Sequence, residues 1–255
     1  MPEVAVRTKV YSRGRRIVYE KKALVEFCPW IRTESLETHV LISDLAHSLG
    51  VPFGPAEASA GLLRRLERWA AMERIVDQYA ADGTLLASYA RTVAPDEIWR
   101  LSLGKASQSS LEYGLLVFRG PYTLNHFQIV GPGTFATCHS RRFLLDEPAS
   151  DYSRGVTLPV QAGVQLSLFL MNRGAGPNQI RVLSQRCGTR VARAVTVTLP
   201  RLGSKLLCLS RTFPSAAEAG GSLLYHVEGR APFDFYTLME NSRAAEETFS
   251  IQHIK

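Results

Sequence analysis

Two stretches of similar pattern decide the fold: GTLLASYARTVAP at residues 83–95 and GTRVARAVTVTLP at residues 188–200. Each begins with Gly-Thr, continues with alternating side chains, and reaches a proline twelve positions after the glycine. Alternation with a period of two residues is typical of a β-strand, and glycine and proline mark the turns and edges of sheets. The equal spacing predicts that one structural unit occurs twice in the chain.

Further markers recur in the same order around these stretches. In each half an apolar run leads to a proline: Leu115-Leu116-Val117 leads to Pro121, and Leu223-Leu224-Tyr225 leads to Pro232. A Thr-Phe pair then follows in each half and precedes His139 in the first and His253 in the second. Each half otherwise contains short runs rich in Val, Leu, Thr, Phe and Tyr, interrupted by turn residues, which is typical of an antiparallel sandwich. The sequence therefore predicts a mainly β protein with two tandem antiparallel β-sandwich copies related by internal duplication, at residues 23–147 and 155–255.

The first copy contains additional residues where the strand pattern stops. Gly54-Pro55 resembles the start of a helix, and apolar residues follow it at helical spacing: Leu62, Leu66 and Trp69. We therefore expect one helical insertion at about residues 55–72. The rival interpretation is a βαβ fold built around this helix, but one helix cannot cover both faces of a parallel sheet.

Composition and charge limit the class of protein. The chain has 255 residues, of which 45% are hydrophobic and 21% charged, so it can bury a sizeable core. No apolar run approaches the roughly 20 residues of a membrane-spanning helix, and the first residues lack the apolar core of a signal peptide. We expect a cytoplasmic protein without a membrane span.

The N-terminal segment, residues 1–22, is basic. It holds seven Lys and Arg residues against two Asp and Glu residues, a balance of +5 within the net charge of +7. Such an arm can follow a phosphate backbone or an anionic membrane surface through residues such as Arg13, Arg15 and Arg16. The alternative is a basic edge strand or a frayed tail, because Lys and Arg protect sheet edges from aggregation. The sequence contains no nucleic-acid-binding motif, so we favour the alternative.

The turn and strand residues also resemble a known family. The stretch from Thr38 through Val76-Asp77-Gln78-Tyr79 and Asp82-Gly83 to Tyr113-Gly114 and Pro121 resembles the small β-sandwich of the sensory rhodopsin transducer family. The helical insertion and the duplication depart from that family's pattern. The resemblance implies an oligomeric, non-enzymatic binding module with a role in signalling or ligand binding, and it carries over no catalytic residue.

Candidate ligand-binding residues come from the repeat. Of the six histidines, only His139 and His253 occupy equivalent places in the two copies. If the copies pack about a pseudo-twofold axis, the two imidazoles can form a site for a ligand, an anion or a metal; alternatively, each histidine simply ends a strand at a polar edge. Arg141 and Arg142 follow His139 and suit anionic partners, unless they form a solvated basic face. No zinc-ligand spacing is present, so we predict no metal and no cofactor.

No catalytic constellation is recognisable. There is no Gly-x-Ser-x-Gly motif, and Cys138 and His139 point to opposite faces if they lie on one strand. We therefore predict a non-catalytic β-sandwich protein that binds a ligand or partner, in signalling or scaffolding, and that forms a homo-oligomer or binds another protein. The expected small ligand is an anion or a saccharide. The alternative is an enzyme that acts on saccharides or other polar substrates in a groove between the two copies.

Overall fold

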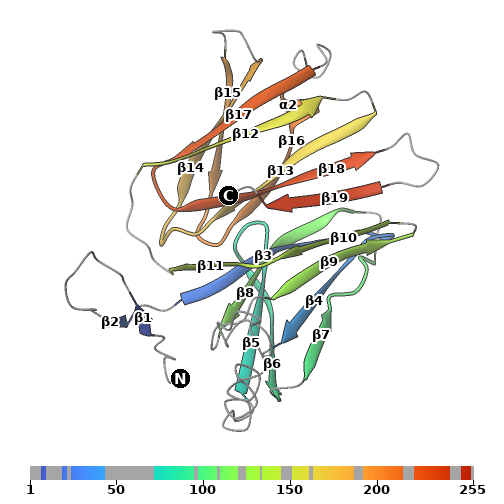
Figure 1. Ribbon diagram of the computed structural model, residues 1–255, viewed down its shortest axis with the longest axis vertical. Helices are drawn as coiled ribbons and strands as arrows, with labels where there is room; N and C mark the ends of the chain where they lie inside the picture. Colours follow the sequence, from blue (N-terminus) through green and yellow to red (C-terminus); the bar gives the residue numbers. More distant parts are fainter. Residues whose placement is uncertain are drawn as a thin grey trace, which may run out of the picture.

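The structure is a computed structural model that describes residues 7–9, 19–21, 24–43, 72–94, 97–107, 110–119, 125–132, 134–144, 151–160, 163–186, 192–214, 221–241 and 248–253. The helix expected at residues 55–72, apart from Met72, lies outside these described residues, as do Arg13, Arg15 and Arg16. The described part is mainly β and its strand pairs are antiparallel, so the predicted fold class is confirmed (Figure 1).

The first half of the chain forms two sheets. Sheet I has five strands in the order β11 (Arg141–Leu144), β3 (Leu24–Arg32), β8 (Glu112–Arg119), β5 (Met72–Ala80) and β6 (Leu85–Val93). Sheet II has four strands in the order β10 (Thr134–His139), β9 (His126–Gly131), β4 (Glu37–Ser43) and β7 (Ile98–Ser102). These two sheets form the first sandwich.

The second half forms two further sheets. Sheet III has the order β12 (Tyr152–Val160), β17 (Gly221–Gly229), β14 (Asn178–Arg186) and β15 (Ala192–Leu199). Sheet IV has the order β16 (Ser204–Cys208), β13 (Val164–Asn172), β18 (Phe233–Asn241) and β19 (Thr248–His253). A single helical turn that the sequence did not predict, α2 (Leu209–Thr212), follows β16.

The two sandwiches share one strand order. The order β3-β8-β5-β6 in sheet I corresponds to β12-β17-β14-β15 in sheet III, and β10-β9-β4-β7 in sheet II corresponds to β19-β18-β13-β16 in sheet IV. Strand β11 is the one described strand of the first sandwich without a counterpart. Descent of both halves from one duplicated unit stays a prediction, with which this topology is compatible.

The basic N-terminal segment contributes two short strands. Strands β1 (Arg7–Lys9) and β2 (Tyr19–Lys21) pair with each other and form a separate two-stranded sheet. The described parts of this segment therefore do not extend an edge of either sandwich. The choice between a basic arm and a frayed tail stays open.

Strand alternation produces the core of the first sandwich. Cys28 and Trp30 on β3 are fully or almost fully buried, and they face Val40 on β4 and Phe127 on β9 across the two sheets. The Trp30 indole N–H donates a hydrogen bond of 2.9 Å to the Tyr79 carbonyl oxygen, so this large ring is buried with its polar group satisfied.

The two sandwiches share a hydrophobic joint. Strand β13 is buried on both faces: Leu168 points into the second sandwich, whereas its neighbour Phe169 belongs to the core cluster of the first. Phe169 meets Tyr113 edge to face at a centroid distance of 5.8 Å, and Tyr236 meets Phe127 at 5.6 Å. Strands β10 and β19 lie side by side at this joint (Figure 1). The continuous apolar run of β13 is therefore explained by burial on both sides.

A hairpin of the first sandwich also contacts the second. The turn at Asp82-Gly83 joins β5 and β6, and Gly83 adopts a φ of 82° that favours glycine. A Cβ atom on Gly83 would overlap the Arg201 carbonyl oxygen, and the Ser204 N–H donates a 2.9 Å hydrogen bond to the Ala81 carbonyl. This turn therefore docks directly against the turn between β15 and β16.

Candidate functional site

A polar row crosses the outer face of sheet III. The strand register places Ser153 opposite Glu228, Glu228 opposite Arg181, and Arg181 opposite Thr196, so the row runs across β12, β17, β14 and β15. On β17 the alternate residue Val227 is fully buried in the core of the second sandwich. Because successive strand residues point to opposite faces, the polar side chains of the row point outward.

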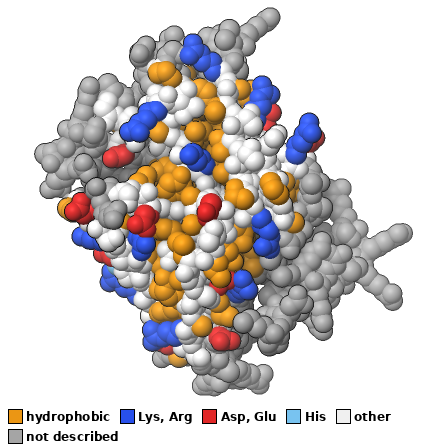
Figure 2. Space-filling model, turned by 180° about the vertical axis from the view of Figure 1, so that it is seen from behind, with side chains coloured by type: hydrophobic (Ala, Val, Ile, Leu, Met, Phe, Trp, Pro, Cys, Tyr) orange, Lys and Arg blue, Asp and Glu red, His pale blue; other side chains and the backbone are white. Residues whose placement is uncertain are grey.

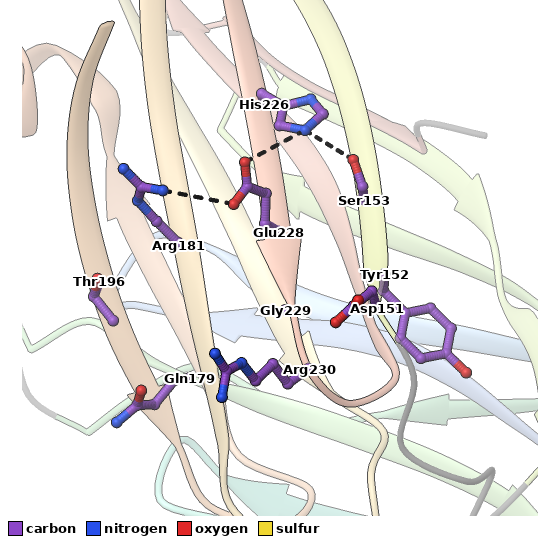
Figure 3. Close-up of a pocket in the computed structure, with 10 residues that line it drawn as sticks. All are labelled: Asp151, Tyr152, Ser153, Gln179, Arg181, Thr196, His226, Glu228, Gly229 and Arg230. Carbon is purple, nitrogen blue, oxygen red and sulfur yellow. Dashed lines mark hydrogen bonds and ion pairs between the residues drawn. The ribbon is translucent and has the colours of Figure 1, made fainter.

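This row lies in an open groove with a volume of about 560 Å³. The groove is drawn in Figure 3 and is lined by Asp151, Tyr152, Ser153, Gln179, Arg181, Thr196, His226, Glu228, Gly229 and Arg230. All ten residues come from the second half of the chain. The groove therefore lies on the second sandwich and not between the two sandwiches.

Four side chains at the centre of the groove contact one another. His226 Nε2 lies 2.8 Å from the Ser153 hydroxyl oxygen and 3.6 Å from Glu228 Oε1, and Arg181 Nη1 lies 3.8 Å from Glu228 Oε2 (Figure 3). Each of the three charged or titratable side chains is 40–54% exposed. Ion pairs this exposed contribute little stability, so the arrangement orients side chains more than it holds the sheet together.

Other polar groups of the groove are free to meet a ligand. Among the described residues, the side chains of Asp151, Gln179, Thr196 and Arg230 have no hydrogen-bond or ion-pair partner. The Tyr152 ring packs edge to face on Phe233 at a centroid distance of 6.4 Å, which holds it at the end of the groove. The groove therefore offers unused donors and acceptors beside an oriented network.

The Ser153, His226 and Glu228 contacts do not have the geometry of a catalytic triad. In a triad the histidine contacts the serine through one ring nitrogen and the carboxylate through the other. Here both partners approach the same atom, His226 Nε2. The carboxylate therefore does not hold the imidazole in the tautomer that activates a serine.

The histidines expected to form a site end neighbouring strands. His139 ends β10 and His253 ends β19. Tyr236 pairs with His253 in the sheet, and its hydroxyl donates a hydrogen bond of 3.1 Å to the His139 carbonyl oxygen. The joint thus brings the two backbone segments together. The side chain of His253 is not among those that the structure describes, so a shared site of the two imidazoles stays a prediction.

The predicted arginines lie on a different sheet from His139. Arg141 pairs with Phe27 and Arg142 pairs with Glu26, both on β3 of sheet I, whereas His139 belongs to sheet II. The chain crosses between the sheets at Ser140, so adjacency in the sequence does not give one shared face. The side chains of Arg141 and Arg142 are outside the described part.

A buried polar cluster occupies this crossing point. The Glu26 carboxylate accepts hydrogen bonds from the Ser140 hydroxyl at 2.5 Å and from the Asn125 side-chain amide at 2.8 Å. Burial lowers the pKa of the Arg74 guanidinium to about 10, and the charge of Glu26 opposes that shift. The residues of this cluster are 1–5% exposed, so we interpret the cluster as structural and not as a ligand site.

Sequence reasoning did not identify the groove on sheet III. Its residues come from four separate stretches, and only the strand register brings them together. The signal that could have found them is the polar alternation on β14 and β17, where Gln179 and Arg181, and His226 and Glu228, alternate with buried residues.

The comparisons with known proteins give no family for this chain. No protein-family model matches the sequence, and no curated protein matches it. In the part of the chain that the structure describes, no helix is long and apolar enough to cross a membrane. Within the same residues, no group of three or more His, Cys, Asp and Glu side chains could hold a metal ion.

Proposed function

We propose that the protein is a non-catalytic binding module and that the groove on sheet III binds a saccharide or a similar polyhydroxylated ligand. The observation that carries this proposal is the set of unpartnered polar side chains in the groove, Asp151, Gln179, Thr196 and Arg230. Each hydroxyl of a sugar both donates and accepts hydrogen bonds, so it fits a surface that presents both kinds of group.

The charge of the groove favours a neutral ligand over an anion. Two arginines, Arg181 and Arg230, are balanced by two carboxylates, Asp151 and Glu228. An anionic ligand would meet the carboxylates as well as the arginines, whereas a neutral polar ligand can use both. Figure 2 likewise shows Lys and Arg side chains interspersed with Asp and Glu on the face that it displays, and this mixture does not favour nucleic acid.

A titration with a panel of neutral mono- and oligosaccharides tests the proposal. We expect saturable binding by the wild-type chain and weaker binding by Gln179→Ala and Arg230→Ala, because each variant removes a free group from the groove. Gln128→Ala is the matched control, since Gln128 lies on the outer face of β9 in the other sandwich. Absence of saccharide binding, or unchanged binding by both groove variants, would contradict the proposal.

A second candidate function is a hydrolase that acts on saccharides. Its specific support is the presence of two carboxylates, Asp151 and Glu228, in one groove with His226, because glycoside hydrolysis requires a pair of carboxyl groups. Incubation with oligosaccharides and chromatography of the products distinguishes the two functions. Turnover that Glu228→Gln abolishes would establish the enzyme, whereas binding without turnover supports the module.

We also retain two proposals that come from the sequence and from the resemblance to the transducer family, self-association and a cytoplasmic location. Light scattering of the purified chain measures its mass in solution, and a mass of a single chain of 28.2 kDa would contradict self-association. Cell fractionation tests the location.

A further inference from the structure

Two histidines face each other on the outer face of sheet II. Strands β9 and β10 form a hairpin in which Gly131 pairs with Thr134 at the turn. His126 lies five residues before Gly131 and His139 lies five residues after Thr134, so the register places these two histidines directly opposite each other. Their neighbour Phe127 is buried in the core of the first sandwich, and their neighbour Cys138 packs against that core, so both imidazoles are on the outer side of the sheet.

The hydrogen-bond pattern brings the two side chains close. The Ser140 N–H donates a 2.7 Å hydrogen bond to the Asn125 carbonyl oxygen. Asn125 and Ser140, which follow the two histidines on the side away from the turn, are therefore a hydrogen-bonded pair. Pairs alternate along an antiparallel ladder, so His126 and His139 form a non-hydrogen-bonded pair. In such a pair the Cα atoms are about 4.5 Å apart, and the Cβ atoms lie at the short end of the range of about 4.5–5.5 Å.

This spacing suits chelation of one metal ion by two imidazoles. A histidine nitrogen lies about 2.0–2.1 Å from a bound zinc ion, so two side chains on opposed Cβ atoms can reach the same ion by rotation about their side-chain bonds. His126 is exposed, and within the described residues its side chain has no partner that would have to be displaced. Water can occupy the remaining coordination positions.

Two other histidines whose side chains the structure describes, His39 and His226, have partners of their own. His39 is on the same face of sheet II, but its Nε2 lies 3.2 Å from Glu37 Oε1, and Arg100 Nη2 lies 3.4 Å from its Nδ1. His226 contacts Ser153 and Glu228 on sheet III. Among the side chains that the structure describes, His126 and His139 are therefore a two-ligand arrangement, in agreement with the absence there of any cluster of three or more ligands.

We propose that His126 and His139 form a bidentate site for a borderline divalent transition metal ion such as Ni²⁺, Cu²⁺ or Zn²⁺. Imidazole nitrogens prefer these ions, whereas Mg²⁺ and Ca²⁺ prefer oxygen ligands. The site lies beside the joint of the two sandwiches, since the His139 carbonyl accepts the hydrogen bond of Tyr236. A metal at this position links the ends of β9 and β10 at that joint.

Calorimetric titration of the full chain, without an affinity tag, with NiCl₂ and separately with ZnCl₂ tests this site. We expect one saturable site in the wild-type chain. We expect His126→Ala and His139→Ala each to weaken metal binding by at least about tenfold. Replacing a residue that only supports a metal ligand already costs about that much affinity, and here the ligand itself is removed. An excess of Mg²⁺ or Ca²⁺ should leave the Ni²⁺ affinity unchanged.

His226→Ala is the matched control, because it removes a partly exposed histidine from a different sheet. This variant should bind Ni²⁺ and Zn²⁺ as the wild type does. His139 lies at the joint and its replacement can disturb folding, so the exposed position His126 provides the decisive variant, with circular dichroism to confirm its fold. Absence of saturable binding by the wild type, or wild-type affinity in His126→Ala, would overturn the proposal.

Discussion

Glu26 is a carboxylate almost removed from solvent inside the first sandwich, where Ser140 and Asn125 donate hydrogen bonds to it. Arg74 lies in the same interior and interacts electrostatically with Glu26. Removing both charges from water is costly, so each depends on the other and on the surrounding donors. At the scale of single residues, this cluster is where a small chemical change has a large expected effect.

The variant Glu26→Gln keeps the shape of the side chain and removes its charge. The buried Arg74 guanidinium then loses the favourable charge of Glu26, so we expect the free energy of unfolding to fall by at least about 1 kcal/mol. The double variant Glu26→Gln, Arg74→Met should recover part of this loss, because it leaves no uncompensated charge. Urea denaturation at neutral pH measures both effects, and a single variant as stable as the wild type would contradict the electrostatic dependence of Arg74 on Glu26.

Cys28 gives a pH-dependent prediction. Burial raises the pKa of this thiol well above its ordinary value of 9.0, and the charges of Glu26 and Cys138 act in the same direction. As the pH rises above about 9, the unfolded chain therefore loses this proton before the folded chain does. The contribution of Cys28 to the free energy of unfolding is constant below that pH and falls above it, by about 1.4 kcal/mol per pH unit.

Urea denaturation at a series of pH values between about 7.5 and 10.5 measures this slope. Cys28→Ala should lose stability less steeply with pH than the wild type does. Cys208→Ala is the control, because Cys208 is only half-buried and lies in the second sandwich. Equal slopes for the wild type and Cys28→Ala would show that the thiol does not contribute.

Strands of this fold carry different chemistry on their two faces. On β17, Tyr225 and Val227 fill the core of the second sandwich, while His226 and Glu228 line the groove. On β9, Phe127 and Ile129 are buried, while His126 is exposed. Both candidate sites are therefore built on strands whose inner residues hold them in place, and this gives a rigid support for binding.

The β5–β6 hairpin provides a prediction at the scale of an element. Gly83 combines a positive φ with a position where a Cβ atom would overlap the Arg201 carbonyl oxygen. Gly83→Ala should therefore strain the turn and separate it from the second sandwich, with an expected loss of more than about 1 kcal/mol. Gly176→Ala, at a glycine with open space around it, is the control and should stay near wild-type stability. Thermal denaturation compares the two, and equal midpoints would contradict the docking role of Gly83.

Local patterns predicted these elements better than the sites. The turn at Asp82-Gly83 and the alternation around it are visible in the sequence, because backbone conformation and burial impose them within a few residues. The row from Ser153 to Thr196 depends on the register of four strands far apart in the sequence. The pair of His126 and His139 could have been predicted from the sequence, since each lies five residues from the turn residues Gly131 and Thr134. That prediction would first have required recognition of the hairpin.

At the scale of the whole molecule, the joint makes one body of two sandwiches. Phe169, Met171, Tyr236 and Leu238 belong to the second sandwich and are part of the same buried cluster as the core of the first. Interfaces between domains are usually more polar than domain cores. An apolar joint of this kind predicts that neither sandwich unfolds without affecting the other.

Differential scanning calorimetry tests this coupling. The wild-type chain should unfold in one cooperative transition. Phe169→Ala removes the ring that contacts Tyr113 across the joint, so we expect a cost of about 3–5 kcal/mol and a separation into two transitions. Leu168→Ala is the control: it is the adjacent residue on β13, but its side chain points into the second sandwich, so it should lower the midpoint and retain a single transition. Two transitions in the wild type would show that the joint does not couple the sandwiches, and one transition in Phe169→Ala would show that the coupling does not depend on the Phe169 ring.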